Sequence, residues 1–305
     1  MPKVSVIIPA FNAARYLGET MASVLNSSFH DLELIVVDDG SKDETAQVAQ
    51  SFVDNRVCVI RQSNRGMSAS RNAGIAAATG QYIALLDADD VWHPDKLKLQ
   101  VTLLDSQPEI GVCFTEFQIW HGSPIPDFSS QETSEKIEAS LTGWIYPKMI
   151  LTHFALPSTI VFRRSVWDAL GPFLCENHQT DDWEYFVRAS RAFRFAKLSD
   201  RLVLYRQHQG SLSKRPSPLN STEAMRTRLL QQYGMTCPNG GPVDAVALAQ
   251  RQYLGLRHFA DGHLAHGDFA LGLRSFGQLL RHSPQRFSTL LTLLKSIRQR
   301  IRRSF

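Results

Sequence analysis

Four short apolar runs alternate with helical patterns along the first 87 residues, and this alternation restricts the fold more than any other feature. The runs at residues 4–9, 32–37, 57–61 and 82–86 are strand candidates, and helical spacing covers 13–25, 42–52 and 67–79. Strands and helices in this order form right-handed β-α-β units around a mainly parallel sheet. The sequence therefore predicts an α/β fold with a Rossmann-like, mainly parallel sheet.

Acidic residues follow two of these strands. Asp38 and Asp39 come after the second strand, and Asp87 and Asp89 come after the fourth. The carboxyl ends of parallel strands face the crevice in which α/β sheets bind ligands. Two carboxylates spaced i, i+2 in a turn converge readily on Mg²⁺ or Mn²⁺, which prefer oxygen ligands. The pattern indicates a site for a nucleotide and a divalent cation, and a turn stabilised by aspartates is the alternative.

The rest of the chain is less regular. Strands are expected at 114–120, 159–162 and 202–205, a long polar loop at 121–140, and helices at 182–193, 245–259, 269–280 and 286–303. Asn12 and Ser41 are expected to cap the first two helices. No strand pattern remains beyond Ser213. These patterns divide the chain into residues 1–108, 109–212 and a helical appendage at 213–305.

Composition excludes several classes of protein. Four dispersed cysteines indicate a reduced, cytoplasmic chain without a structural zinc site. No apolar run is long enough to span a membrane, and the N-terminus does not resemble a signal peptide. Neither Gly-x-Gly-x-x-Gly nor a P-loop motif is present, which excludes a standard dinucleotide dehydrogenase and a P-loop NTPase.

Charge is distributed unevenly. Residues 213–305 contain 14 Lys and Arg against 4 Asp and Glu, so within a total of +4 the first 212 residues carry −6. No nucleic-acid recognition motif accompanies this basic region, so nucleic acid is not an expected partner. The helix expected at 286–303 is basic and amphipathic, and it fits peripheral contact with an anionic membrane surface. Covering the rest of the molecule, or a second subunit in an oligomer, fits this helix equally well.

Four sequence blocks occur in order within the first 94 residues: Val-Ser-Val-Ile-Ile-Pro-Ala-Phe-Asn at 4–12, Asp-Asp-Gly-Ser at 38–41, Asn-Arg-Gly-Met-Ser-Ala-Ser-Arg-Asn-Ala-Gly at 64–74 and Leu-Asp-Ala-Asp-Asp at 86–90. In these blocks the chain resembles the family 2 glycosyltransferases. The resemblance implies the GT-A fold of nucleotide-diphospho-sugar transferases. It also implies transfer of a sugar, with inversion, from a nucleotide-diphosphate donor. UDP is the expected nucleotide, with dTDP and GDP open.

The resemblance assigns roles to individual residues. The implied donor-binding residues are Pro9, Phe11, Asn12, Asp38, Asp39, Arg71 and Asp87. The implied ligands of Mn²⁺ or Mg²⁺ are Asp89, Asp87 and His208, the last from a Tyr-Arg-x-His segment. Alternatives remain: core packing for Phe11, a helix N-terminal acid for Asp38 or Asp39, a structural ion pair for Arg71 and no special role for His208.

Asp181-Asp182-Trp183 resembles the Glu-Asp-Trp segment of the family, in which the second acid is the general base. This implies that Asp182 accepts the proton of the acceptor hydroxyl. The chain departs from the family pattern at Asp181, where the family has Glu, and this leaves the base in place. From composition alone, two helix-capping acids would explain the pair.

The implied enzyme is a hexosyltransferase that adds one sugar per encounter, because the Gln-x-x-Arg-Trp segment of processive synthases is missing. Its expected acceptor is a hydroxyl of a glycan or lipid-linked glycan in polysaccharide or cell-envelope biosynthesis, and residues 1–108 and 109–212 would bind donor and acceptor respectively. The expected location is cytoplasmic, with the inner face of the membrane as an alternative. A nucleotidyltransferase and a non-catalytic sugar-nucleotide-binding protein are the rival functions.

Overall fold

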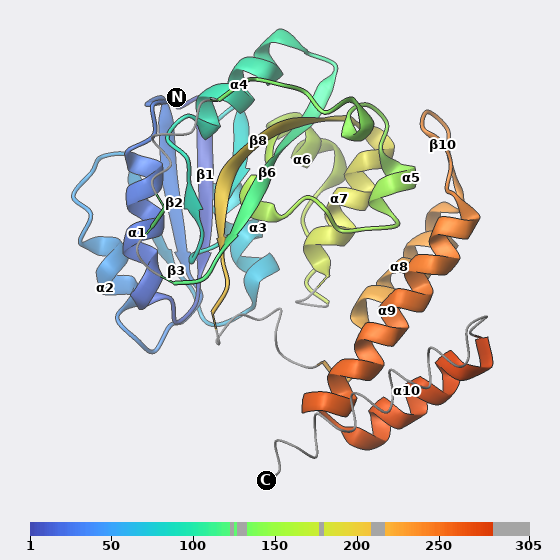
Figure 1. The fold of residues 1–305 in the computed structure, drawn as a ribbon. Helices are drawn as coiled ribbons and strands as arrows, with labels where there is room; N and C mark the ends of the chain where they lie inside the picture. Colours follow the sequence, from blue (N-terminus) through green and yellow to red (C-terminus); the bar gives the residue numbers. More distant parts are fainter. Residues whose placement is uncertain (123–124, 127–132, 177–179, 209–216, 283–305) are drawn as a thin grey trace.

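A computed structural model describes residues 1–122, 125–126, 133–176, 180–208 and 217–282. Helices and strands alternate regularly up to β4 and less regularly afterwards (Figure 1). The strands are β1 (Val4–Ala10), β2 (Leu32–Asp38), β3 (Val57–Arg61), β4 (Tyr82–Leu85), β5 (Val91–Trp92), β6 (Ile110–Trp120), β7 (Val161–Arg163), β8 (Arg194–Arg206), β9 (Thr236–Cys237) and β10 (Gly241–Pro242). The helices are α1 (Ala14–Leu25), α2 (Thr45–Gln50), α3 (Met67–Ala77), α4 (Lys96–Ser106), α5 (Tyr146–Met149), α6 (Arg164–Leu170), α7 (Asp181–Ala192), α8 (Ser221–Tyr233), α9 (Ala245–His266) and α10 (Phe269–His282), with short 3₁₀ helices η1 (Ala139–Leu141) and η2 (Pro157–Thr159).

One sheet of eight strands, in the order β3-β2-β1-β4-β7-β6-β8-β5, forms the centre of the molecule. The first four strands pair in parallel, as the sequence predicts, and β6 pairs in parallel with β8. The short strands β7 and β5 run antiparallel to their neighbours. The long strands of the sheet therefore point the same way, and their carboxyl ends share one edge.

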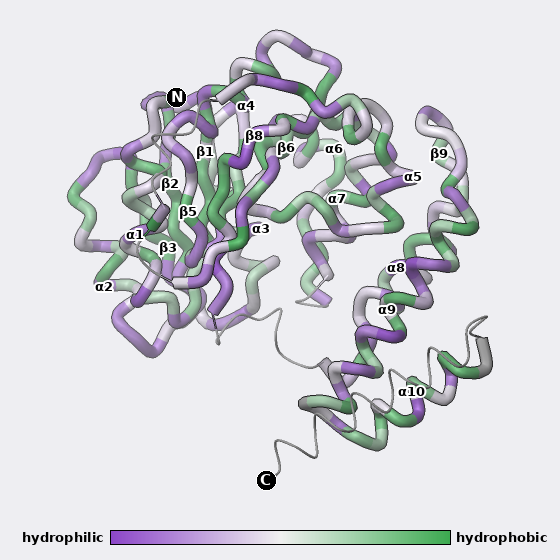
Figure 2. Tube along the Cα trace, viewed as in Figure 1, coloured by the Kyte–Doolittle hydropathy of each residue, from purple (hydrophilic) through white to green (hydrophobic). Residues whose placement is uncertain are grey.

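Helices cover both faces of this sheet. The core on one face contains side chains of α1, α2 and α4, and the core on the other face contains side chains of α3, α5, α6, α7 and α8. Strands enclosed in this way require apolar residues on both sides. The inner strands accordingly are hydrophobic along most of their length (Figure 2). The arrangement is the predicted α/β fold.

The C-terminal helices extend away from the sheet, beyond α7 (Figure 1). Met225 and Leu229 of α8 and Leu248 near the start of α9 belong to the main core, and further along the chain α9 and α10 pack on each other around Leu264 and Phe276. Within the described ranges, none of the helices has both the length and the apolar content to cross a bilayer. The basic helix expected at 286–303 lies outside the described residues.

Several local predictions were wrong. Asn12 and Ser41 do not cap helices, because α1 starts at Ala14 and α2 at Thr45, without a side-chain cap at either. Instead the two residues bond the loops after β1 and β2 together, with the Asn12 N–H donating to Ser41 Oγ and the Lys42 N–H donating to Asn12 Oδ1, both at 2.9 Å. The contacts needed to recognise this arrangement lie about thirty residues apart in the chain.

The extent of the strands also differs from the predictions. β8 begins at Arg194, earlier than expected, since Lys197 and the polar residues 199–201 interrupt its apolar pattern where it pairs with β6. β6 also begins earlier than expected, at Ile110. The short hairpin of β9 and β10 lies in a region expected to contain helices only. Part of the loop expected at 121–140 also touches the sheet, through a bridge between Ile137 and Leu198.

Lys96, in the first turn of α4, is a fully buried basic residue. Its Nζ lies 3.9 Å above the Trp92 ring and has no hydrogen-bond partner among the described residues. Burial lowers the pKa of Lys96 well below its ordinary value. The unfolded chain therefore binds more protons than the folded chain between this lowered pKa and the ordinary pKa near 10.4, so wild-type stability rises with pH across that range.

Replacing Lys96 with methionine is therefore expected to stabilise the fold at pH 7 by about 1–3 kcal/mol, the cost of burying an unpaired polar group. The gain should shrink as the pH approaches 10, because removing the proton from Lys96 on folding then costs the wild-type protein little free energy. Urea unfolding at pH 7 and pH 10 measures both effects, and the exposed Lys98→Met is the matched control. Equal stability of Lys96→Met and wild type at pH 7 would contradict this account.

Candidate active site

The shared carboxyl edge of the sheet gathers most of the residues singled out in the sequence. Phe11 and Asn12 follow β1, Asp38 and Asp39 lie at the end of β2, and Asp87 and Asp89 follow β4; His208 follows β8. The strands that carry them run in the same direction. Residues from four distant segments therefore line one edge, the usual position of ligand sites in such sheets.

Asp39 fastens the loop before α3 to this edge. Its Oδ1 accepts hydrogen bonds from Gln62 Nε2 at 2.7 Å and from the Arg65 N–H at 2.9 Å, and its Oδ2 accepts one from the Gly66 N–H at 2.8 Å. A Cβ at Gly40, where φ is +76°, would lie 2.9 Å from a backbone nitrogen of the same loop. Glycine is thus required where the two loops approach most closely.

Asp38 is fully buried beside it. Oδ1 of Asp38 accepts from the Ser41 N–H at 3.0 Å, and Oδ2 faces Arg61 Nε at 3.3 Å. Pro9 is buried in β1, whereas Phe11 just after that strand is 47% exposed and does not join the core. The aromatic ring next to the two aspartates is therefore open to solvent, and core packing does not explain Phe11.

Asp87 pairs with Arg71 from α3, at 2.7 Å between Oδ1 and Nη2. Arg71 is almost completely buried, and this ion pair holds its guanidinium inside the protein. Ser158 in η2 supports the same turn: its Oγ accepts from the Asp87 N–H at 3.1 Å and donates to Asp90 Oδ2 at 2.5 Å. The Asp90 carboxyl is buried, and its other oxygen accepts from the Arg206 N–H.

Three carboxyls within four residues repel one another. Burial and the Asp87 charge raise the pKa of Asp89, while its hydrogen bond with His208 opposes the rise. Burial and the charges of Asp89 and Asp87 raise the pKa of Asp90 well above its ordinary range. Ionising these carboxyls together is therefore unfavourable, and a bound cation would relieve that cost.

His208 meets Asp89 directly, with Nε2 2.9 Å from Oδ2, and its ring packs on Tyr16 with centroids 4.7 Å apart. Arg206, two residues earlier, donates from Nε to the Asp89 carbonyl at 2.7 Å. Its guanidinium also lies 4.0 Å from the Trp120 ring centroid. The end of β8 therefore positions the Asp89 turn through both backbone and side chain.

Asp182 lies in the first turn of α7, where acidic side chains interact favourably with the helix dipole. Its Oδ1 accepts from the Trp183 N–H at 2.7 Å. The preceding Asp181 is buried and accepts from Ser68 Oγ at 3.2 Å. This contact fixes the start of α7 against the start of α3.

The first turn and a half of α3 connects the separate parts of the site. Gly66 donates to Asp39, Ser68 to Asp181, and Arg71 to Asp87. Gly66, which immediately precedes α3, and the α3 residues Ser68 and Arg71 span only six residues, or about 8 Å along the helix axis. The acids after β2 and β4 and the start of α7 consequently surround one helix end.

Some predicted groupings are not formed. Within the described part of the chain, no three His, Cys, Asp or Glu side chains gather closely enough to hold a metal without other ligands. Asp89 and His208 meet, but Asp87 is turned to Arg71. Sequence reasoning missed Ser158 and His153, which stands 3.9 Å from Asp182. Neither carries a sequence signal, because each depends on contacts between segments far apart in the chain.

Comparison with known proteins agrees with this geometry. The family described as Glycosyl transferase family 2 matches residues 5–170, more than half of the chain. An uncharacterized glycosyltransferase of Rickettsia prowazekii is 32% identical over 197 residues, which make up 63% of this chain and 61% of that relative. The matched part thus spans less than two thirds of the relative's length.

Two solved structures share the fold. Residues 1–349 of TarS from S. aureus superimpose with a TM-score of 0.61 at 19% identity, covering 99% of this chain and 92% of that one. Mannosyltransferase PcManGT from Pyrobaculum calidifontis gives a TM-score of 0.61 at 20% identity, covering 98% and 87%. With the family match and the α/β sheet described above, these similarities show that the chain belongs to glycosyl transferase family 2 and has the GT-A fold.

Proposed function

We propose that this enzyme transfers a single sugar, with inversion, from a nucleotide-diphosphate sugar to a hydroxyl of a glycan or lipid-linked glycan. The observation that carries the proposal is the convergence of Asp39, Asp87 and the Asp181–Asp182 pair on the first turns of α3. It brings a donor-binding edge next to a carboxylate suited to activating a hydroxyl. UDP is the proposed nucleotide. The TarS structure is a complex with UDP-GlcNAc, and the PcManGT structure is a complex with GDP-Man and Mn²⁺.

The donor side is proposed to bind the nucleotide along the β1 and β2 edge. The exposed ring of Phe11 offers an apolar face for a base. Asp38 and Asp39 are proposed to accept hydrogen bonds from base or ribose through lone pairs left after their internal bonds, since an ionised carboxylate has about four acceptor sites. Pro9 and Asn12 shape the loop, and Arg71 acts by holding Asp87.

The acidic turn is proposed to hold Mn²⁺ or Mg²⁺ through Asp89, with Asp87 and His208 beside it. The residues fit such a cation in two respects: burial and the neighbouring Asp87 charge raise the pKa of Asp89, and the oxygen and imidazole donors of the group suit Mn²⁺. Mg²⁺ and similar ions are usually held by one or two carboxylates together with substrate phosphates, so a complete protein cage is not needed. When bound, the cation supplies Lewis-acid stabilisation of the departing diphosphate.

Asp182 is proposed to be the general base. A hydroxyl is a weak nucleophile at neutral pH, and a carboxylate within hydrogen-bond reach can remove its proton while the new C–O bond forms. The proton moves to Asp182, the hydroxyl oxygen bonds the anomeric carbon, and the bond from that carbon to the diphosphate breaks. Because the leaving group is a diphosphate, a second carboxylic acid of the kind used by glycosidases is not required.

The remaining parts of the molecule are assigned with the same proposal. Residues 1–108 are proposed to bind the donor, and residues 109–212 to contribute the base and the acceptor surface. The helices α8, α9 and α10 form a region that packs onto the acceptor half through α8. The basic segment 286–303 is proposed as the membrane-contacting part of a cytoplasmic enzyme that acts on cell-envelope glycans. An oligomer that uses the same segment is compatible with this assignment.

A thermal-shift panel of nucleotide sugars with and without Mn²⁺ tests the donor assignment. We expect one of UDP-GlcNAc, UDP-glucose, dTDP-glucose or GDP-mannose to raise the melting temperature, and the rise to require Mn²⁺. A ligand at a hundred times its Kd stabilises the fold by about 2.7 kcal/mol, which corresponds to a shift of several degrees.

The same panel separates the rival functions. A nucleotidyltransferase would respond to nucleoside triphosphates and release pyrophosphate from them. A non-catalytic binding protein would show the shift but release no nucleoside diphosphate when acceptors are added. The absence of any response to the four nucleotide sugars would contradict the proposal.

A further inference from the structure

His153 is a partly buried residue that directs a buried ring nitrogen toward the proposed base. It lies in the irregular segment between α5 and η2, and its side chain is 26% exposed. Its Nε2 is 3.9 Å from Asp182 Oδ2 and has no hydrogen-bond partner among the described residues, although the atom is shielded from solvent. A buried, unsatisfied ring nitrogen is costly, so its position next to a carboxylate requires an explanation.

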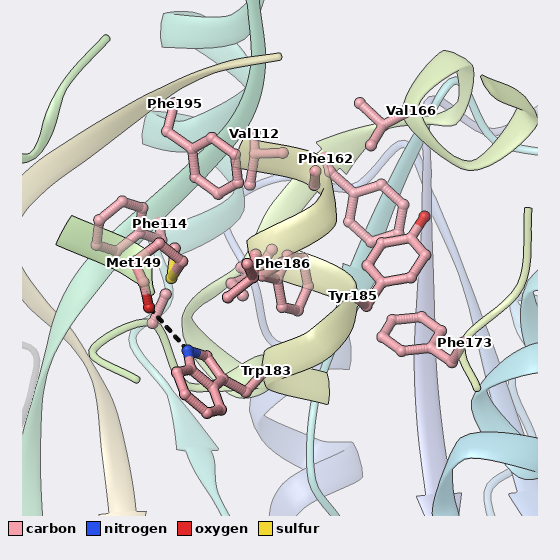
Figure 3. Close-up of a cluster of buried hydrophobic side chains, with 14 of the residues drawn as sticks. Val112, Phe114, Met149, Phe162, Val166, Phe173, Trp183, Tyr185, Phe186 and Phe195 are labelled. Atoms are coloured by element: carbon pink, nitrogen blue, oxygen red, sulfur yellow. Dashed lines mark hydrogen bonds between the residues drawn. The ribbon is translucent and has the colours of Figure 1, made fainter. Parts of the chain in front are cut away.

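Packing holds the imidazole in this place. The ring stacks on Trp183, with centroids 6.4 Å apart and planes at 30°. Trp183 is itself fixed, because its Nε1 donates to the Met149 carbonyl at 2.8 Å beneath the aromatic core of α7 (Figure 3). The histidine and the residue after the base are therefore packed as one unit.

The segment that leads to His153 is also held from α8. Arg226 is 4% exposed and donates from Nε to the Ile150 carbonyl at 3.0 Å and from Nη2 to the Leu151 carbonyl at 3.2 Å. Its guanidinium lies 5.2 Å from the Trp183 ring centroid, on the same indole that supports His153. Two elements besides α7 therefore determine where the imidazole stands.

We propose that His153 is a positioning residue for Asp182, an inference that rests on the proposed role of Asp182 as general base. Oδ1 of Asp182 is already bonded to the Trp183 N–H, so Oδ2 is the oxygen whose direction remains to be fixed. A separation of 3.9 Å is too long for a hydrogen bond, and a shift of about 1 Å brings the pair into range. His153 in its neutral form, with the proton on Nε2, then donates to Oδ2.

This bond orients the carboxylate without consuming its capacity to act as a base. Oδ2 has two acceptor sites, so one receives the His153 proton donor while the other faces the acceptor hydroxyl. During transfer the hydroxyl proton moves to Asp182, and His153 keeps its own proton. The gain comes from geometry, since misplacing a reacting group by about 1 Å can reduce a rate by about a hundredfold.

The first test observes the contact without any substrate. In protein labelled with ¹⁵N-histidine, with the signal assigned by its loss in His153→Gln, we expect His153 to carry its proton on Nε2 and its Nε2 resonance to shift in Asp182→Asn. The Nδ1–H tautomer, or a resonance unaffected by Asp182→Asn, would overturn the proposal.

The second test measures the effect on chemistry, using release of nucleoside diphosphate from UDP-GlcNAc, UDP-glucose, dTDP-glucose and GDP-mannose with Mn²⁺, with water as the acceptor. His153→Phe keeps a ring on Trp183 but removes the donor, and we expect kcat to fall about 10-fold to 100-fold with KM for the sugar nucleotide unchanged. His153→Gln restores an N–H donor and should recover most of the rate. Equal losses in the two variants, or no loss in His153→Phe, would show that only ring packing matters.

Asp182→Asn in the same assay keeps the two proposals distinguishable. If Asp182→Asn abolishes release while His153→Phe does not alter it, Asp182 remains the proposed base and the positioning role of His153 is wrong. If Asp182→Asn releases diphosphate at the wild-type rate, the proposed roles of Asp182 and His153 are both wrong. Melting temperatures of all three variants within a few degrees of wild type establish that the kinetic differences arise in folded protein.

Discussion

Asp182→Asn is expected to reduce sugar transfer by about 10²-fold to 10⁴-fold, the usual contribution of a general base, while leaving donor affinity nearly unchanged. Asparagine has nearly the same shape and can still accept the hydrogen bond from the Trp183 N–H, but it cannot take up the proton of a hydroxyl. Transfer rates under saturating donor, together with calorimetric titration of the donor in the presence of Mn²⁺, measure the two quantities separately.

Asp168→Asn is the control for this experiment, because Asp168 is an exposed carboxylate on α6. It should change neither rate nor affinity. A variant of Asp182 that loses donor affinity and rate in equal proportion would indicate that the residue binds the donor. Another residue, on α7 or on an element packed against it, would then have to be the general base.

Asp89→Ala is expected to weaken Mn²⁺-dependent donor binding by more than about 100-fold, because removing a residue that only supports a metal ligand typically costs about 10-fold to 100-fold. The substitution removes the carboxylate that His208 contacts and reduces the negative charge that raises the pKa of Asp90. Calorimetric titration of the donor with Mn²⁺, and again after chelation with EDTA, measures the effect. Chelation should weaken binding to the wild type far more than to the variant.

Asp31→Ala provides a matched control, since Asp31 is exposed in the turn before β2, at the opposite end of that strand from Asp38. It should behave as wild type with and without chelation. If the Asp89→Ala protein binds the donor and Mn²⁺ with unchanged affinity, Asp89 is not a ligand of the metal. Asp87→Asn would then be the next substitution to compare.

The elements of the first half could be predicted because their signals are local. Apolar runs of β1, β2 and β4 are buried on both faces and therefore remain visible without knowledge of their neighbours. Asp38, Asp39 and Asp87 are found from the same pattern, because they lie at or just after the carboxyl ends of β2 and β4. The placement of Asp182 at the start of α7 likewise agrees with the helix expected from 182 onward.

Other features could not be predicted because they depend on contacts with residues that are far away in the sequence. β8 pairs along its length with β6, and the polar residues that interrupt its apolar pattern are accommodated where the register between the two strands shifts. Asn12 has the sequence position of a helix cap but bonds the loop after β2 instead. In both cases a tertiary partner outweighs the local preference of the residue.

By itself, the sequence determined the order of strands and helices, the family and the positions of acids at strand ends, because strand periodicity and sequence motifs are properties of neighbouring residues. Only the tertiary structure decided that Arg71 is bound to Asp87, that Ser158 joins Asp87 to Asp90, that His153 stands beside the proposed base, and that Arg226 donates to the Leu151 carbonyl. These contacts join residues from 16 to 75 positions apart. The physical reason is that a hydrogen bond or a ring contact depends on separation in space, which folding sets and which spacing along the chain does not reveal.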